Sequence, residues 1–203
     1  MRKILKLFLF LCFVAVLFWF GGVLSDRQSL GEDIIRLHVV ANSDSEADQA
    51  LKLQVRDAVV SQLQTVMEQM PSAEEAKLWL QENIEELERF VNQYLSDVGS
   101  GETAKITFLK EEFDTREYDT FSLPAGVYES LRITIGEGEG KNWWCVVFPS
   151  LCAPATTEGF ADKAAGSGFE NSLTGALNNN GGYKVRFFLL DCLGRIENFF
   201  FRS

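Results

Sequence analysis

The stretch that decides the fold is residues 34–60, IIRLHVVANSDSEADQALKLQVRDAVV. Its first seven residues alternate in polarity and are rich in β-branched side chains, which predicts a strand over residues 34–40. Ser43, followed three residues later by Glu46, has the pattern of a capping box and predicts the start of a helix. Apolar residues then recur every three or four positions, which predicts that this helix continues to about residue 70.

Downstream of this helix the sequence predicts a second helix and then strands. Another capping-box pattern, Ser72 with Glu75, predicts a helix to about residue 97. From residue 100 the apolar pattern has a period of two, which is typical of strands. The predicted strands are residues 104–109, 116–121, 131–135, 143–148 and 185–190, with a hairpin loop over 136–142, a long and partly disordered loop over 153–182 and a short helix in the tail. These elements predict an α+β fold in which two helices pack on one face of a mainly antiparallel sheet.

The N-terminus has the pattern of an export segment, in which basic residues precede an uncharged apolar run over residues 7–24. As a helix this run spans roughly 27 Å, slightly less than the roughly 30 Å hydrocarbon core of a bilayer. We expect the glycine pair at residues 21–22 to break the helix ahead of a cleavage site. The sequence therefore predicts a signal peptide or membrane anchor over residues 1–25 and an exported domain over residues 26–203, and it leaves cleavage open.

The predicted exported domain is strongly acidic. The chain has 19 basic and 29 acidic residues and a formal net charge of −10. Arg2, Lys3 and Lys6 precede the first acidic residue, Asp26, so the remaining 16 basic residues face 29 acidic ones, an excess of 13 negative charges. Phosphate backbones repel such a body, which argues against nucleic-acid binding.

Catalytic and metal-binding patterns are weak in this sequence. His38 is the single histidine and the only base available to a nucleophilic Cys145, Cys152 or Cys192, and its place within a predicted strand favours a structural role. Zinc needs three or four clustered ligands, and the sequence has no C-x-x-C pattern. We therefore predict no catalytic, metal or cofactor site. Outside the cytoplasm Cys145 and Cys152 could pair in a disulfide, or they could be small buried hydrophobic residues.

Two features of the sequence are candidates for contact with a partner. Lys52 and Arg56 lie one turn apart on the first predicted helix and form a basic patch on an acidic body. Trp143 and Trp144 are neighbours on a predicted strand, so their side chains face opposite sides of the sheet. One of them is a candidate interface anchor beside the glycine-rich loop, although both could equally be packed in the core.

Three stretches of the chain resemble the stage II sporulation protein R family of endospore-forming bacteria. They are IRLHVVANSDSEADQALKLQVRDAV at residues 35–59, LPAGVYESLRITIGEGEGKNWWCVVFPSLC at residues 123–152, and the N-terminal export segment. The order and the spacing of these stretches match the family, whereas residues 153–203 show no family pattern.

The resemblance implies a signalling protein rather than an enzyme. Members of this family are made in the forespore and exported into the space between the forespore and mother-cell membranes. There they activate a membrane-embedded aspartic protease of the mother cell, which cleaves the pro-form of sigma factor E. The residues in the matched motifs that we expect to contact the protease are Asn42, Ser43, Asp44, Lys52, Arg56 and Trp143 or Trp144.

Two other functions are compatible with the sequence. A secreted cell-wall hydrolase or cysteine peptidase would need His38 and one of the cysteines as catalytic residues. A membrane-anchored ligand-binding or structural module would need only an N-terminal segment that remains uncleaved.

Overall fold

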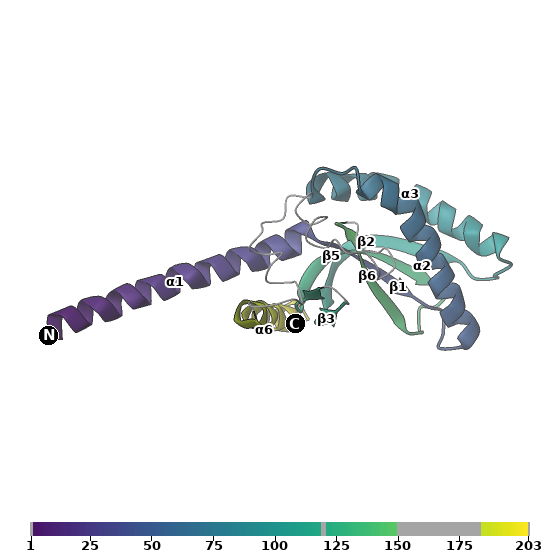
Figure 1. The fold of residues 1–203 in the computed structure, drawn as a ribbon. Coiled ribbons are helices and arrows are strands. Elements are labelled where there is room, and N and C mark those ends of the chain that lie inside the picture. Colours follow the sequence, from purple (N-terminus) through teal and green to yellow (C-terminus); the bar gives the residue numbers. More distant parts are fainter. Residues whose placement is uncertain (1, 119–120, 150–183, 203) are drawn as a thin grey trace.

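A four-stranded sheet forms the centre of the domain that follows the N-terminal helix (Figure 1). The computed structural model describes residues 2–118, 121–149 and 184–202, so the loop predicted over residues 153–182 lies outside the described residues. The elements are α1 (Arg2–Asp33), β1 (Ile35–Val40), α2 (Glu46–Met67), α3 (Ala73–Asp97), β2 (Ala104–Phe113), β3 (Arg116–Glu117), β4 (Ser122–Leu123), β5 (Gly126–Ile135), β6 (Asn142–Phe148) and α6 (Lys184–Phe201).

The strand order in the sheet is β2–β5–β1–β6, so β1 lies in the interior while β2 and β6 form the edges. β1 pairs in parallel with β5, where Leu37 lies opposite Leu131, and antiparallel with β6, where Leu37 lies opposite Cys145. β2 pairs antiparallel with β5, where Ile106 lies opposite Ile133. The prediction of a mainly antiparallel sheet is therefore confirmed.

The predicted hairpin between β5 and β6 is wrong, because β1 lies between these two strands. All six residues of β1 are buried, and the backbone of a buried strand needs a hydrogen-bonded neighbour on each side. The loop of residues 136–141 therefore crosses two strand spacings, roughly 10 Å, over the carboxyl end of β1. This crossing brings the glycine-rich loop against the residues that directly follow β1.

Helices cover both faces of the sheet (Figure 1). On one face α2 and α3 pack over a core that includes Leu37 and Leu80. On the other face the last turns of α1 pack together with α6 around a second core, which includes Leu30, Tyr128 and Leu190. The predicted α+β class with two helices on one face is confirmed, and the second helical layer is a feature that the sequence pattern did not reveal.

The predicted final strand over residues 185–190 is wrong, because this segment is the first part of α6. Leu190 is fully buried, and a Cβ on Gly194, one turn later, would lie 1.6 Å from the carbonyl oxygen of Ala125. A spacing of four residues between close contacts is the period of a helix. This packing overrides the β propensity of the apolar and aromatic residues on which the strand prediction relied.

The predicted strand over residues 116–121 does not join the main sheet. β3 is limited to Arg116–Glu117 and pairs with β4 in a separate two-stranded sheet. The reason is that β2 continues to Phe113 and occupies the full length of β5, whose other edge is taken by β1. No free edge of β5 remains for another strand.

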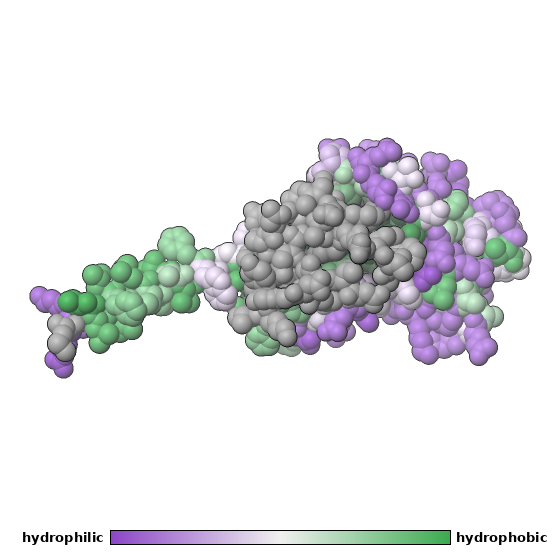
Figure 2. Space-filling model, viewed as in Figure 1, coloured by the Kyte–Doolittle hydropathy of each residue, from purple (hydrophilic) through white to green (hydrophobic). Residues whose placement is uncertain are grey.

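α1 is one continuous helix of 32 residues, and it runs through Gly21 and Gly22 without the predicted break. By length and composition α1 could cross a membrane, and it is the only such helix among the described residues. Figure 2 shows its apolar surface as a green rod that projects from the domain. Val23, Arg27 and Leu30 in its last turns are buried, so the end of α1 belongs to the core of the domain.

Serine side chains determine where α2 and α3 begin. The Oγ of Ser72 accepts a hydrogen bond from the backbone N of Glu75 (3.3 Å), which confirms the predicted start of α3. At α2 the capping side chain is Ser45, which accepts from the backbone N of Asp48 (3.1 Å). The prediction of Ser43 as the cap is wrong, because the Ser43 hydroxyl is used in the turn that precedes α2.

Candidate functional site

Asn42 joins three segments of the chain at the carboxyl end of β1. Its amide nitrogen donates to Asp48 Oδ2 (3.3 Å) and Glu102 Oε1 (3.1 Å), and its amide oxygen accepts from the backbone N of Glu137 (3.0 Å). These partners belong to α2, to the connection between α3 and β2, and to the β5–β6 loop. A single side chain thus holds together segments that are distant in sequence.

The β5–β6 loop approaches this turn so closely that glycine is required at two positions. Gly136 has a φ of 56°, and a Cβ there would lie 2.3 Å from Asn42 Oδ1. A Cβ on Gly140 would lie 2.3 Å from the carbonyl oxygen of Ser43. The backbone N of Gly140 also donates to the carbonyl oxygen of Ala41 (2.9 Å). The repeated glycines of the loop are therefore explained by close backbone contact with the turn.

Ser43 and Asp44 complete the turn before α2. Asp44 Oδ1 accepts a hydrogen bond from the backbone N of Lys141 (2.8 Å), and Ser43 Oγ donates to Asp48 Oδ2 (2.5 Å). The pKa of Asp48 lies below its usual value, mainly because its carboxylate accepts this hydrogen bond from Ser43. The turn and the loop therefore form one hydrogen-bonded unit.

Lys52 is buried under the β5–β6 loop, and the expectation that it lies in an open basic patch is wrong. Its side chain is only 4% exposed. The ammonium group donates to the carbonyl oxygen of Lys141 (3.0 Å) and to Gln49 Oε1 (2.6 Å). Burial lowers the pKa of Lys52. The spacing explains this position, because Lys52 lies three residues before the buried Val55 and so on the inner face of α2.

Trp143 is the exposed part of this region, and the partly buried Arg56 covers its ring. The Arg56 guanidinium lies 4.3 Å above the centre of the Trp143 ring, and its Nη2 is 2.6 Å from Asp57 Oδ1. Trp143 is 37% exposed and lies on the edge strand β6. An accessible tryptophan covered by arginine is typical of residues that contribute strongly to protein interfaces.

Trp144 lies apart from these residues, on the opposite face of the sheet. Its ring stacks on the imidazole of His38, with ring centroids 3.6 Å apart, and its edge contacts Phe113. As the sequence predicted, the neighbouring tryptophans face opposite sides of β6. Of the two, the structure places only Trp143 beside Arg56 and the β5–β6 loop.

His38 belongs to a partly buried polar cluster, which sequence reasoning missed because its partners come from other strands. The Nδ1 of His38 lies 3.1 Å from Glu111 Oε2 on β2, and Arg132 Nη1 on β5 lies 2.9 Å from Glu111 Oε1. Burial acts to raise the pKa of Glu111, but the hydrogen bond to His38 and the charges of His38 and Arg132 outweigh it and hold this pKa below its usual value.

The structure separates His38 from Cys145. Cys145 packs against the core under α2 and α3, which lies on the face of the sheet opposite His38, so the two residues cannot act as a catalytic pair. Cys145 is disulfide-bonded, whereas Cys12 and Cys192 are free thiols. The predicted partner Cys152 lies outside the described residues, and the pairing of Cys145 with Cys152 stays a prediction.

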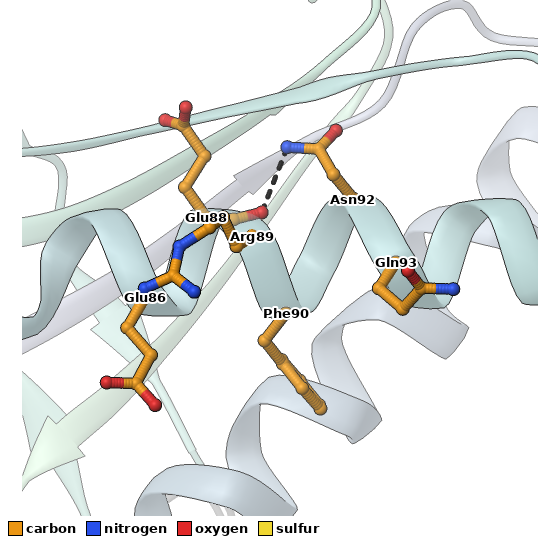
Figure 3. A pocket seen from close by; sticks show the side chains of 6 residues that line it. All are labelled: Glu86, Glu88, Arg89, Phe90, Asn92 and Gln93. Atoms are coloured by element: carbon orange, nitrogen blue, oxygen red, sulfur yellow. Dashed lines mark hydrogen bonds between the residues drawn. The ribbon is translucent and has the colours of Figure 1, made fainter.

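Within residues 2–118, 121–149 and 184–202, no three histidine, cysteine, aspartate or glutamate side chains converge as metal ligands would. An open pocket lies along α3 and is lined by Glu86, Glu88, Arg89, Phe90, Asn92 and Gln93 (Figure 3). Its polar groups hold the edge strand β2. Glu88 Oε2 accepts from the backbone N of Ile106 (2.8 Å), and Asn92 bonds both backbone groups of Ala104.

Comparison with known proteins identifies the family. The model of the family described as stage II sporulation protein R matches residues 31–158. Stage II sporulation protein R of Bacillus subtilis (strain 168) is 38% identical over 132 residues, which are 65% of this chain and 59% of that protein. The chain therefore matches less than two thirds of that relative's length. No solved structure matches the chain. The chain belongs to the stage II sporulation protein R family.

Proposed function

We propose that this chain is an exported signalling protein of endospore formation. It acts in the space between the forespore and mother-cell membranes and activates the membrane-embedded aspartic protease that cleaves pro-sigma factor E. Membership of the stage II sporulation protein R family supports the role in sporulation. The apolar α1, preceded by Arg2, Lys3 and Lys6, supports export, because the positive end of such a segment stays in the cytoplasm.

The contact surface that we propose is the distal surface, which consists of Asn42, Ser43, Asp44, Arg56, Lys141 and Trp143. The observation that carries the proposal is that the distal surface lies at the end of the sheet away from α1. β1 begins two residues after α1 ends, and its six residues advance roughly 20 Å before they reach the β1–α2 turn. α1 and this turn lie on opposite sides of the domain (Figure 1). A domain held at one membrane would thus direct the distal surface toward the other.

The distal surface combines a rigid frame with an accessible anchor. Asn42 and Asp44 bind the backbone of the β5–β6 loop, so little conformational freedom would be lost when a partner binds. Trp143, under the guanidinium of Arg56, supplies an aromatic and cationic contact of the type that dominates many interfaces. The chain would activate the protease by binding its active state more tightly than its inactive state.

The proposal is tested by co-expression of the full chain with the protease and pro-sigma factor E in a bacterium that does not sporulate. Cleavage of pro-sigma factor E that requires this chain and its export supports activation. Arg56→Glu should slow cleavage at least about tenfold, a loss of about 1.4 kcal/mol of binding free energy. Arg89→Glu is the matched control, because Arg89 is exposed on α3 outside the distal surface.

Two results would contradict the proposal. Cleavage that proceeds equally well without export of the chain would exclude an action between the membranes. Equal cleavage by the Arg56→Glu and Arg89→Glu proteins, at equal abundance, would exclude the distal surface as the contact with the protease.

A further inference from the structure

α6 has an apolar face that the domain leaves exposed. One side of the helix packs on the domain, where Leu190 is fully buried and Gly194 lies against the backbone of Ala125. The opposite side carries large apolar residues with high exposed fractions, namely Phe188 (63%), Ile196 (55%), Phe199 (69%) and Phe200 (71%). A helix that is apolar on two opposite sides normally has a packing partner on each of them.

The position of α6 indicates what covers this second face. The apolar run of α1 ends at Leu24, and Arg27 lies three residues later, about 4.5 Å further along the helix axis. The Nη2 of Arg27 is 2.5 Å from Glu197 Oε2 on α6. If α1 spans a membrane, the C-terminal turns of α6 therefore lie at the depth of the lipid headgroups. In Figure 1 the C-terminal end of α6 lies on the side of the domain that α1 enters.

The charge of α6 fits the same location. Arg195 on α6 and Arg202, which directly follows it, have highly exposed side chains, 63% and 75%, and they pair with Asp191 and Glu112. Both arginines lie beside the apolar stripe. α6 has three basic and two acidic residues and is followed directly by Arg202, in a domain that is otherwise acidic. Arginine next to aromatic residues is typical of helices that lie in a membrane interface, where guanidinium groups reach lipid phosphates while the apolar face enters the acyl boundary.

We propose that α6 lies on the surface of the same bilayer that α1 spans, with Phe188, Ile196, Phe199 and Phe200 inserted among the lipids. The domain would then contact its membrane at two places, α1 and α6. Two contacts restrict rotation of the domain and so keep its orientation relative to the membrane constant. This inference depends on α1 spanning the bilayer, and it does not depend on the proposed activation of a protease.

The test measures the depth of α6 in a membrane. The full chain with Cys12→Ser and Cys192→Ser carries a nitroxide spin label at Phe199→Cys or Ile196→Cys, in vesicles of phosphatidylcholine and phosphatidylglycerol. We expect both labels to collide more with oxygen, which concentrates in lipid, than with a water-soluble nickel chelate. A label at Leu78→Cys should show the opposite preference, because Leu78 is a 50% exposed residue on α3.

Two outcomes would overturn the proposal. Labels on α6 that are as accessible to the nickel chelate as the label on α3 would place α6 in water. Labels on α6 that are protected from both reagents and show spin–spin coupling between chains would place a second copy of the chain on this face. Neither readout involves pro-sigma factor E, so failure here is distinguishable from failure of the proposed function.

Discussion

One polar cluster joins side chains from three strands of the sheet, namely His38, Glu111 and Arg132. The carboxylate of Glu111 lies within 3.1 Å of His38 Nδ1 and of Arg132 Nη1. The ring of Trp144 covers His38 on one side. This arrangement gives the lone histidine of the chain a structural role, because its Nδ1 and its ring face are both occupied.

The cluster leads to a prediction about stability and pH. The pKa of Glu111 is lower in the folded than in the unfolded state, so its ionisation stabilises the fold. This contribution is complete above the unfolded-state pKa of about 4.3, and it is lost as the pH falls through the lower folded-state pKa. Glu111→Gln should lower the free energy of unfolding at pH 7 by about 1–3 kcal/mol. The free energy of unfolding of this variant should also decrease less than that of the parent chain when the pH is lowered into the acid range.

Urea unfolding at several pH values checks this expectation. Glu117→Gln is the control, since Glu117 is an exposed residue on β3 and should change neither the stability nor its pH dependence. An acid transition in the Glu111→Gln protein that equals that of the parent chain would show that Glu111 does not contribute to it.

At the scale of elements, α3 protects the open edge of the sheet. β2 is an edge strand, and unpaired edge groups can pair with other chains. Asn92 satisfies both backbone groups of Ala104 at distances of 2.8 and 2.9 Å, and Glu88 binds the backbone N of Ile106. The pocket in Figure 3 is thus the surface of a helix that covers an edge.

Asn92→Leu should therefore destabilise the domain by about 2 kcal/mol, because the backbone groups of Ala104 lose their partners. It should also increase aggregation through the freed edge of β2. Gln93→Leu, one residue later, adds a leucine at an exposed position, where the Gln93 side chain bonds only Asp97 of its own helix among the hydrogen bonds of the described residues. This variant should leave the stability within about 0.5 kcal/mol. Urea unfolding and light scattering measure the two effects. Similar values for both variants would contradict the protective role of Asn92.

At the scale of the whole molecule, α1 is both an apolar helix and part of the core. Leu30 is fully buried against the second core, and Arg27 binds the carbonyl oxygen of Val127 and the carboxylate of Glu197. A cleavage near residue 25 would leave these contacts in place. The end of α1 would then remain with the domain whether or not the apolar run is removed.

Two shortened chains test this role of α1. A chain of residues 26–203 retains Arg27 and Leu30, whereas a chain of residues 34–203 lacks both. The second should be less stable by about 2–5 kcal/mol or more, because loss of a buried leucine alone has about this cost. Urea unfolding compares the two chains, and equal free energies of unfolding would mean that the last turns of α1 are not part of the core.

The amino-acid sequence by itself determined the elements with strong local patterns. The strand at residues 35–40, the two helices that follow and the apolar N-terminal helix were all predictable, because side-chain periodicity and capping are local properties. The same locality explains why the sequence located the start of α2 to within two residues, at Ser43 where the structure has Ser45. The family motifs around this position also indicated the function that we propose.

Only the tertiary structure decided which elements meet. It placed β1 between β5 and β6, made a helix of residues 184–201, buried Lys52 under the β5–β6 loop and joined His38 to Glu111. Each of these outcomes depends on contacts between residues far apart in the chain, whose free energy outweighs local propensity. A pattern read along the chain carries no information on such contacts, since strand order and burial result from the packing of the whole domain.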